Sequence, residues 1–244
     1  MEASRQLEVP EVTREELDAY YAALPREWGY SSQCKMTLLG EIRGKRVLDI
    51  DCRRGKGIIK LSEYVGARGR AVGIDPSPEW IEIARSYMDD AWRRNGLVEN
   101  NMDYLVGYAE DLASAGLGDG AFDLVFANSS LNVACAPLRA FAEAFRVLRP
   151  GGLLIYDGVV ASTERDPQVV EEARRIGNAI QAAPSRETFE SWARAVGFDV
   201  PDYYEESPVD AATGYVDGYE VPVAPSDERV TFVKTTAHLH KPRW

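Results

Sequence analysis

The stretch from Val47 to Gly57, VLDIDCRRGKG, constrains the fold of this chain more than any other segment. Apolar and β-branched residues lead to Asp49, which is typical of a strand. Gly55 and Gly57 then open a run with apolar residues at helical spacing, which predicts a helix. Free N–H groups at such a helix start, and glycines without a Cβ, let a ligand approach closely. The segment therefore predicts a nucleotide-binding turn, although only the later part of the turn is glycine.

A second acidic residue follows at the distance that a βαβ unit requires. Ala71 to Asp75, AVGID, is a short apolar run that ends in a carboxylate, roughly 26 residues after Asp49. A carboxylate there can accept hydrogen bonds from both hydroxyls of a ribose, each worth about 1.5–3 kcal/mol. We expect Asp75 to bind the ribose of a cofactor. The alternative is a solvated aspartate at the end of a strand.

Length, charge and cysteine content limit the classes of protein. The chain has 244 residues, 45% of them apolar, which suffices for one domain with a full core. With 28 Lys and Arg against 39 Asp and Glu, the net charge is −11, and such a surface repels nucleic acid. No apolar run approaches the roughly 18 residues of a membrane span, and the acidic N-terminus does not resemble a signal peptide. Three irregularly spaced cysteines are no disulfide framework, so we expect a cytoplasmic protein.

Three further segments extend this series of strand and turn motifs along the chain. Tyr104 to Leu112 reads YLVGYAEDL, Phe122 to Asn128 reads FDLVFAN, and Val147 to Asp157 reads VLRPGGLLIYD. With the first two segments they resemble the class I S-adenosylmethionine-dependent methyltransferases over roughly residues 45 to 160, and most of all the arsenite methyltransferase group. The resemblance implies an α/β, Rossmann-like fold. Its sheet would be mostly parallel and seven-stranded, with helices on both faces and an antiparallel C-terminal edge strand.

The same resemblance implies where S-adenosylmethionine binds. The turn after the first strand would face its methionine part, Asp75 its ribose, and the segment around Ala109 its adenine. The end of the fourth strand would lie beside the transferable methyl group. The cofactor-binding residues expected on this basis are Asp49, Asp51, Cys52, Arg53, Gly55, Asp75, Pro76, Tyr108, Ala109, Glu110, Asn128 and Ser129.

The turn departs from the family's G-x-G-x-G pattern. Asp51 and Arg53 stand at two glycine positions, and only Gly55 is kept. A buried arginine needs a partner, which could be a protein carboxylate or the carboxylate of an atypical ligand. Either these side chains point away from the cofactor, or they occupy the space of its methionine tail. In the second case the protein would be a catalytically silent relative that binds a partner or a different ligand.

The cysteines argue against arsenic as substrate. The arsenite enzymes resembled here hold their soft metalloid with thiolates, as ligand softness favours. At two of the family's cysteine positions this chain has Ser129 and Asn178, and Cys34 matches the third only loosely. Cys52 and Cys135 lie in the turn and in a loop, where packing is the alternative to binding. We expect no efficient methylation of arsenite. The candidate substrate contacts are Tyr21, Cys34 and Asn178.

The chain divides into an N-terminal helical cap, residues 1–43, and a methyltransferase-like domain, residues 44–244. In the cap, Thr13 and Glu16 predict a capping box for a helix that ends near Leu24, and a second helix is expected over 32–42. The aromatic residues of this cap either pack within the protein or contact the substrate.

Three later segments interrupt or end the alternation of strands and helices. Residues 158–184 are a candidate lid, and residues 200–227 an irregular insertion that covers the active site or joins two subunits in a homodimer. Residues 229–239 predict a strand, which the resembled fold would place at the sheet edge. His238 and His240 share a face there, but no third metal ligand is evident, so we expect no metal site.

The sequence thus predicts methyl transfer from S-adenosylmethionine to a small-molecule acceptor, without a membrane or nucleic-acid partner. Displacement at a sulfonium depends mainly on in-line placement of the acceptor and the methyl group, so no residue is identified as catalytic. A nicotinamide-dependent dehydrogenase would also use an acidic residue to bind the ribose of its cofactor. It would need G-x-G-x-x-G, however, which the turn after Asp49 does not supply.

Overall fold

The computed structural model describes residues 7–25, 40–128, 130–209 and 229–243. The helices are α1 (Arg14–Ala23), α2 (Lys56–Val65), α3 (Pro78–Arg94), α4 (Pro137–Val147), α5 (Pro167–Arg175) and α6 (Arg186–Val196), with a 3₁₀ turn η1 (Leu131–Val133). The strands are β1 (Arg46–Ile50), β2 (Arg70–Asp75), β3 (Met102–Val106), β4 (Phe122–Asn128), β5 (Leu148–Ala161), β6 (Asp202–Val209) and β7 (Phe232–His240).

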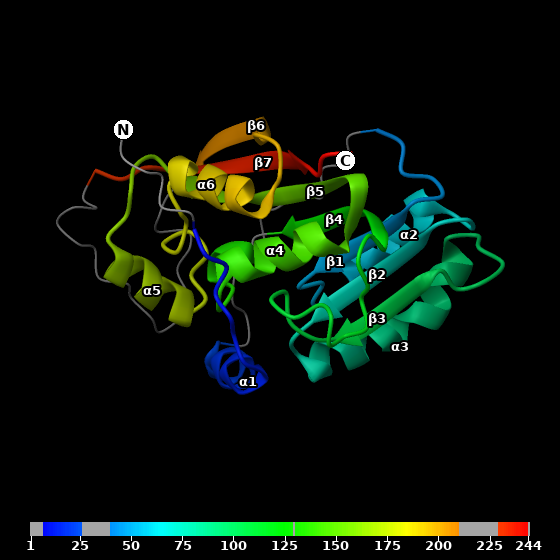
Figure 1. Ribbon diagram of the computed structural model, residues 1–244. Helices are drawn as coiled ribbons and strands as arrows, with labels where there is room; N and C mark the ends of the chain where they lie inside the picture. Colours follow the sequence, from blue (N-terminus) through cyan, green and yellow to red (C-terminus); the bar gives the residue numbers. More distant parts are fainter. Residues whose placement is uncertain (1–6, 26–39, 129, 210–228, 244) are drawn as a thin grey trace.

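The strands form a single sheet across the described residues, in the order β3-β2-β1-β4-β5-β7-β6 (Figure 1). Strands β1 to β5 pair in parallel, and β7 runs antiparallel to both of its neighbours. The predicted α/β fold, with a mostly parallel seven-stranded sheet and an antiparallel C-terminal strand, is confirmed. The C-terminal strand β7 lies one place inside the edge of the sheet, because β6 pairs with its outer side.

Both faces of the sheet are covered, as a parallel sheet requires. Alternate residues of β1 point to different cores, since Val47 packs with the apolar residues of α2 and α3, and Leu48 with those of α4 and α6. Figure 1 shows α4 and α6 side by side over one end of the sheet, with α2 and α3 over the other half. Each helix is therefore held by burial of one apolar face.

The local signals for helix starts are confirmed. The Thr13 hydroxyl accepts from the Glu16 N–H at 3.3 Å, and the Glu16 carboxylate accepts from the Thr13 N–H at 2.8 Å, which is the predicted capping box. Ser77 and Ser185 cap α3 and α6 through their hydroxyls alone, which accept from the N–H groups of Trp80 and Thr188. Such caps satisfy N–H groups that the first helical turn leaves free.

Two predicted segments differ from the structure. Part of the candidate lid, Gly158–Ala161, continues β5, because its backbone pairs with β7 from Thr235 to Phe232. Part of the predicted irregular insertion is β6, where pairing with β7 supplies order that the residue pattern does not show. The rest of that insertion from residue 210, and most of the predicted helix over 32–42, lie outside the described residues.

Among the described helices, none has the length and apolar composition that crossing a membrane would require.

Candidate functional site

The strand order reverses between β1 and β4, since β2 and β3 lie on one side and β5 on the other. In open α/β sheets, ligands bind at the carboxyl ends of the strands at such a reversal. Ile50 pairs with Ala127, so Asp51 and Asn128 are the next residues on the two adjacent strands. The segments predicted to bind the cofactor therefore meet at the place where the fold favours a ligand.

Asp75 ends β2 and is fully buried. Its two carboxylate oxygens accept from backbone N–H groups, one from Arg53 at 2.8 Å and one from Ser77 at 2.9 Å. Burial raises the pKa of this carboxyl to about 6. The two N–H groups fix its orientation, and each oxygen keeps a lone pair for a ligand hydroxyl. Pro76, the next predicted contact, lies in the bend between β2 and α3.

Four buried acids gather at this end of the sheet. Asp49 lies in β1, where burial and then the charge of Asp75 raise its pKa to about 7. Burial and then Asp75 also raise the pKa of Asp51 well above its usual range, and burial raises that of Glu110. Because these carboxyls disfavour one another's ionisation, the site favours a ligand that brings positive charge. S-adenosylmethionine, with a sulfonium and an ammonium, fits such a site, whereas an anionic ligand does not.

Asp51 and Arg53 hold left-handed backbone, with φ of 56° and 49°. Asp51 is 9% exposed, and its Oδ2 has no hydrogen-bond partner in the described part of the chain. The Arg53 guanidinium lies 5.0 Å from the ring centroid of Trp80, and that of Arg54 lies at 5.5 Å. Both guanidinium groups therefore lie near an aromatic ring in α3, while the charge of Arg53 still acts on Asp51 and Asp75.

Gly55 is required by its surroundings. Its φ is 73°, and a Cβ there would lie 2.6 Å from the Tyr104 phenol oxygen. Cys52 lies in the core that α2 forms with the sheet, and a Cβ on Gly73 would lie 2.6 Å from its sulfur. Burial raises the pKa of Cys52 well above its usual range, so this thiol has a packing role.

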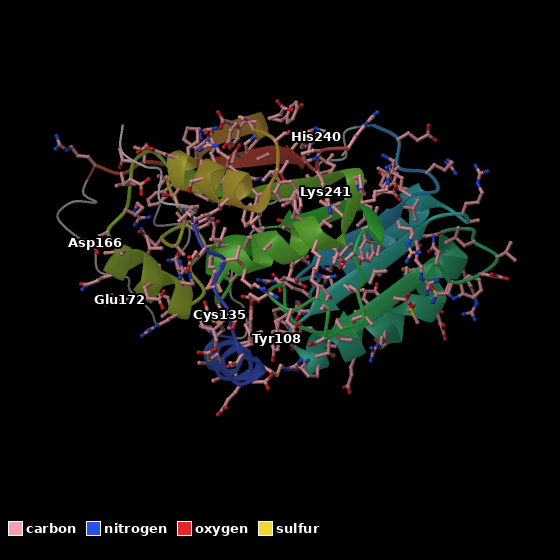
Figure 2. All side chains as sticks on the ribbon, in the orientation of Figure 1. Tyr108, Cys135, Asp166, Glu172, His240 and Lys241 are labelled. Carbon is pink, nitrogen blue, oxygen red and sulfur yellow. The ribbon has the colours of Figure 1, made fainter. Side chains whose placement is uncertain are left out.

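Helix α1 lies on the segment predicted to line the adenine. The Tyr21 hydroxyl donates to the Glu110 carboxylate at 3.1 Å, and the Tyr21 ring stacks on Tyr108 at 5.0 Å between centroids. Tyr108 in turn donates to Asp18 of α1. Figure 2 shows Tyr108 and Cys135 beside this helix. Ala109, between Tyr108 and Glu110, is buried.

The end of β4 has two further unpaired polar atoms. The Oδ1 atom of Asn128 and the Oγ atom of Ser130 are buried without hydrogen-bond partners among the described residues. Ser129 between them lies outside those residues. Sequence reasoning missed Ser130 and Trp80, since a serine in a loop and a tryptophan on an apolar helix face carry no local signal for a site.

Two of the three predicted substrate contacts, Tyr21 and Asn178, lie in the described part of the chain. The Asn178 side chain accepts from the N–H groups of Ile180 and Gln181, at 3.2 and 3.0 Å, which is a turn-capping role. Tyr21 contacts Glu110, and Cys34 lies outside the described residues. Cys135 is a free thiol whose pKa burial raises to about 11.

The described residues contain no group of three or more His, Cys, Asp or Glu side chains that could hold a metal ion. The His238 ring instead packs at 4.6 Å from that of Tyr204.

The sequence is similar to known methyltransferases. Residues 42–199 match a family described as a methyltransferase domain. An arsenite methyltransferase of Aquipseudomonas alcaligenes is 31% identical over 176 residues, which are 72% of this chain and 50% of that protein. The human arsenite methyltransferase is 27% identical over 168 residues, 69% of this chain and 45% of that protein. The chain thus spans about half the length of these curated relatives.

Solved structures agree with the sequence comparison. An arsenic(III) S-adenosylmethionine methyltransferase from Chlamydomonas reinhardtii superposes with a TM-score of 0.75 at 27% identity, over 93% of this chain and 74% of that one. The YcgJ protein from Bacillus subtilis has a TM-score of 0.58 at 19% identity, over 84% of this chain and 94% of that one, and shows the fold alone. The alternative of a catalytically silent relative finds no support in these comparisons.

Proposed function

We propose that this chain, which belongs to the class I S-adenosylmethionine-dependent methyltransferases and is related to the arsenite methyltransferases, methylates a small-molecule acceptor other than arsenite. The observation that carries the proposal is the cluster of buried acids at the reversal of strand order, with Asp75 oriented by two backbone N–H groups. When bound there, S-adenosylmethionine would supply an electrophilic methyl group.

The chain's own residues would hold the cofactor from three sides. Asp75 would accept from the ribose hydroxyls, the segment from Tyr108 to Glu110 would line the adenine, and the turn after β1 would face the methionine part. The contact of Tyr21 with Glu110 would keep α1 over this segment and exclude water from it. The role of these residues is positioning, which is the main requirement of a direct displacement.

The two tyrosines of α1 near the site, Tyr20 and Tyr21, offer no general base. Burial raises the pKa of Tyr20 and that of Tyr21 well above that of free tyrosine, so neither hydroxyl ionises near neutral pH. Glu110 accepts from Tyr21 and from the N–H of Ala136. An acceptor that needs a general base would have to use one of the buried carboxyls, whose pKa values are raised, whereas an acceptor that arrives already nucleophilic, such as a thiolate, needs none.

Arsenite is disfavoured by the thiols that the structure describes. Cys52 is buried in the core, and the pKa of Cys135 is raised to about 11, so both thiols stay protonated near neutral pH. Soft metalloids bind thiolates. We expect no methylated arsenic when the purified protein is incubated with arsenite, glutathione and S-adenosylmethionine and the products are separated by mass spectrometry. Formation of methylarsenite at repeated turnover would overturn this part of the proposal.

Cofactor binding is tested by isothermal titration with S-adenosylmethionine and S-adenosylhomocysteine. We expect micromolar binding, weakened about 10- to 100-fold in Asp75→Asn because a charge-assisted hydrogen bond to the ribose is lost. Asp103→Asn is the matched control, since it removes the same charge from a half-exposed position on β3. Absence of binding at millimolar cofactor would contradict the proposed function.

A further inference from the structure

Asp51 is a buried acid whose polar atoms are not all satisfied by the protein. It is 9% exposed, and its Oδ2 atom lacks a hydrogen-bond partner among the residues that the structure describes. An unsatisfied buried polar group costs about 1–3 kcal/mol, so native proteins usually pair such groups with protein, water or ligand. The unpaired oxygen of Asp51 therefore points to a ligand that donates hydrogen bonds.

A second unsatisfied acceptor lies on the neighbouring strand. Asn128 Oδ1 is also buried without a described partner, and Asn128 follows β4 residue Ala127, which pairs with Ile50 immediately before Asp51. Adjacent strands lie about 4.8 Å apart, so the two residues start from neighbouring backbone positions. The Ser130 hydroxyl and the Arg53 guanidinium also act on Asp51, but its Oδ2 atom and the Oδ1 atom of Asn128 have no hydrogen-bond partner among the described residues. Two unsatisfied acceptors at one point of the sheet match a ligand group that donates several hydrogen bonds.

We infer that the Asp51 carboxylate binds the ammonium group at the methionine end of S-adenosylmethionine, an inference that rests on the proposed function. The cofactor has two cationic groups. The ammonium has three N–H donors, whereas the sulfonium has none, so only the ammonium satisfies an unpaired oxygen. An anionic partner is excluded by the surrounding acids, since Asp75 and Glu110 already raise the pKa of Asp51 by their charge.

The backbone at Asp51 agrees with a role for its side chain. A φ of 56° is strained for most residues with a Cβ, and glycine would adopt it freely. Arg53 shares this geometry, but its side chain lies over Trp80 in α3. Of these two residues, Asp51 is the one whose functional group has a buried, unsatisfied oxygen at the reversal of strand order.

The charged and titratable groups that act on Asp51 decide how its protonation responds to a ligand. Asp75 and Glu110 disfavour its ionised form, whereas the Ser130 hydroxyl and the Arg53 guanidinium favour it. Besides burial, the charge of Asp51 contributes to the raised pKa of Tyr21 in α1. An ammonium adds one cation to this set. The ammonium should therefore favour the ionised form of Asp51.

The test compares Asp51→Asn and Asp51→Gly with the wild type in isothermal titrations of three ligands. S-adenosylmethionine and S-adenosylhomocysteine carry the ammonium, and 5′-methylthioadenosine lacks the amino acid altogether. We expect both variants to bind the first two ligands about 10- to 100-fold more weakly and 5′-methylthioadenosine unchanged.

Thermal unfolding of the ligand-free variants separates a binding defect from a folding defect. Asp51→Gly should be at least as stable as the wild type, because it relieves the left-handed strain, and Arg53→Gly reports the same relief for a side chain that leaves the site. Asp103→Asn controls for the loss of one negative charge.

Each other outcome overturns a distinct claim. Wild-type protein that binds none of the ligands would refute the proposed function. Wild-type binding of S-adenosylmethionine with undiminished binding by both Asp51 variants would refute only the ammonium contact. An equal loss for all three ligands would also refute it, since Asp51 would then merely shape the turn.

Discussion

At the scale of single residues, two residues other than glycine adopt left-handed backbone conformations in the turn after β1. Asp51 and Arg53 adopt φ of 56° and 49°, where a side chain costs roughly 1–2 kcal/mol for most residue types. The structure offsets part of this cost for Arg53 by placing its guanidinium over Trp80. At Gly55, by contrast, a Cβ would lie 2.6 Å from the Tyr104 phenol, so that a side chain there requires Tyr104 to move.

This difference predicts the result of Gly55→Ala. Gly96 has nearly the same φ, 71° against 73°, but no described atom lies within 4 Å of the position that a Cβ would take there. Gly96→Ala should lose about 1–2 kcal/mol of unfolding free energy from strain alone. Gly55→Ala should lose a further 1–3 kcal/mol, roughly, because Tyr104 must move. Urea denaturation of both variants measures the difference, and equal losses would show that Tyr104 moves freely.

At the scale of elements, α1 is held over the site by polar contacts between distant parts of the chain. The Tyr20 hydroxyl lies 2.8 Å from the Val133 carbonyl oxygen and 2.9 Å from that of Arg174. The Tyr21 hydroxyl bonds Glu110. Leu17 is the buried apolar residue of the helix. A ten-residue helix is marginal by itself, so these contacts decide whether α1 stays formed over the cofactor segment.

Tyr20→Phe should therefore loosen α1 without unfolding the sheet. Loss of a buried hydrogen bond worth about 1 kcal/mol should speed amide exchange in Arg14–Ala23 about fivefold. Hydrogen–deuterium exchange by mass spectrometry measures this, with β1 peptides as internal reference. Tyr64→Phe is the matched control, since that tyrosine is 44% exposed on α2. Unchanged exchange in α1 would mean that apolar packing alone holds the helix.

At the scale of the whole molecule, buried acids make the ligand-free protein sensitive to pH. Burial raises the pKa of Asp49 from 3.8 to about 7 and that of Asp75 to about 6. Between pH 4 and pH 7, roughly, the folded state then binds more protons than the unfolded state. The protonated forms of these two carboxyls stabilise the folded protein. Their contribution is fully present below the pKa that each group has in the unfolded chain, and it is lost as the pH rises through its pKa in the folded protein.

We therefore expect the unfolding free energy of the ligand-free protein to fall by a few kcal/mol, roughly, from pH 4.5 to pH 7.5. Asp49→Asn should flatten this dependence, because its side chain does not titrate. Urea denaturation at four pH values measures both curves. A wild-type curve that rises with pH over this range would contradict the burial of uncompensated acids at the site.

Much of the architecture follows from sequence because its signals are local. The apolar run before Asp49, the glycine at 55 and the cap at Ser77 each act within a few residues, so they predict β1, α2 and α3. Strand β6 was missed because its order comes from pairing with β7. Likewise, the residue pattern of the turn could not show that the Arg53 guanidinium lies near the Trp80 ring while an oxygen of Asp51 stays unsatisfied among the described residues.

The sequence by itself predicted most of the strands and helices in their order, because their signals lie within short stretches of the chain. The resemblance of its motifs gave the methyltransferase family and the acid expected at the ribose. Only the tertiary structure decided which side chains meet. It brought Tyr21 of α1 onto Glu110, put Asn178 in a turn-capping role, and left Asp51 Oδ2 without a described partner. The physical reason is that burial and hydrogen-bond satisfaction depend on neighbours that are distant in sequence.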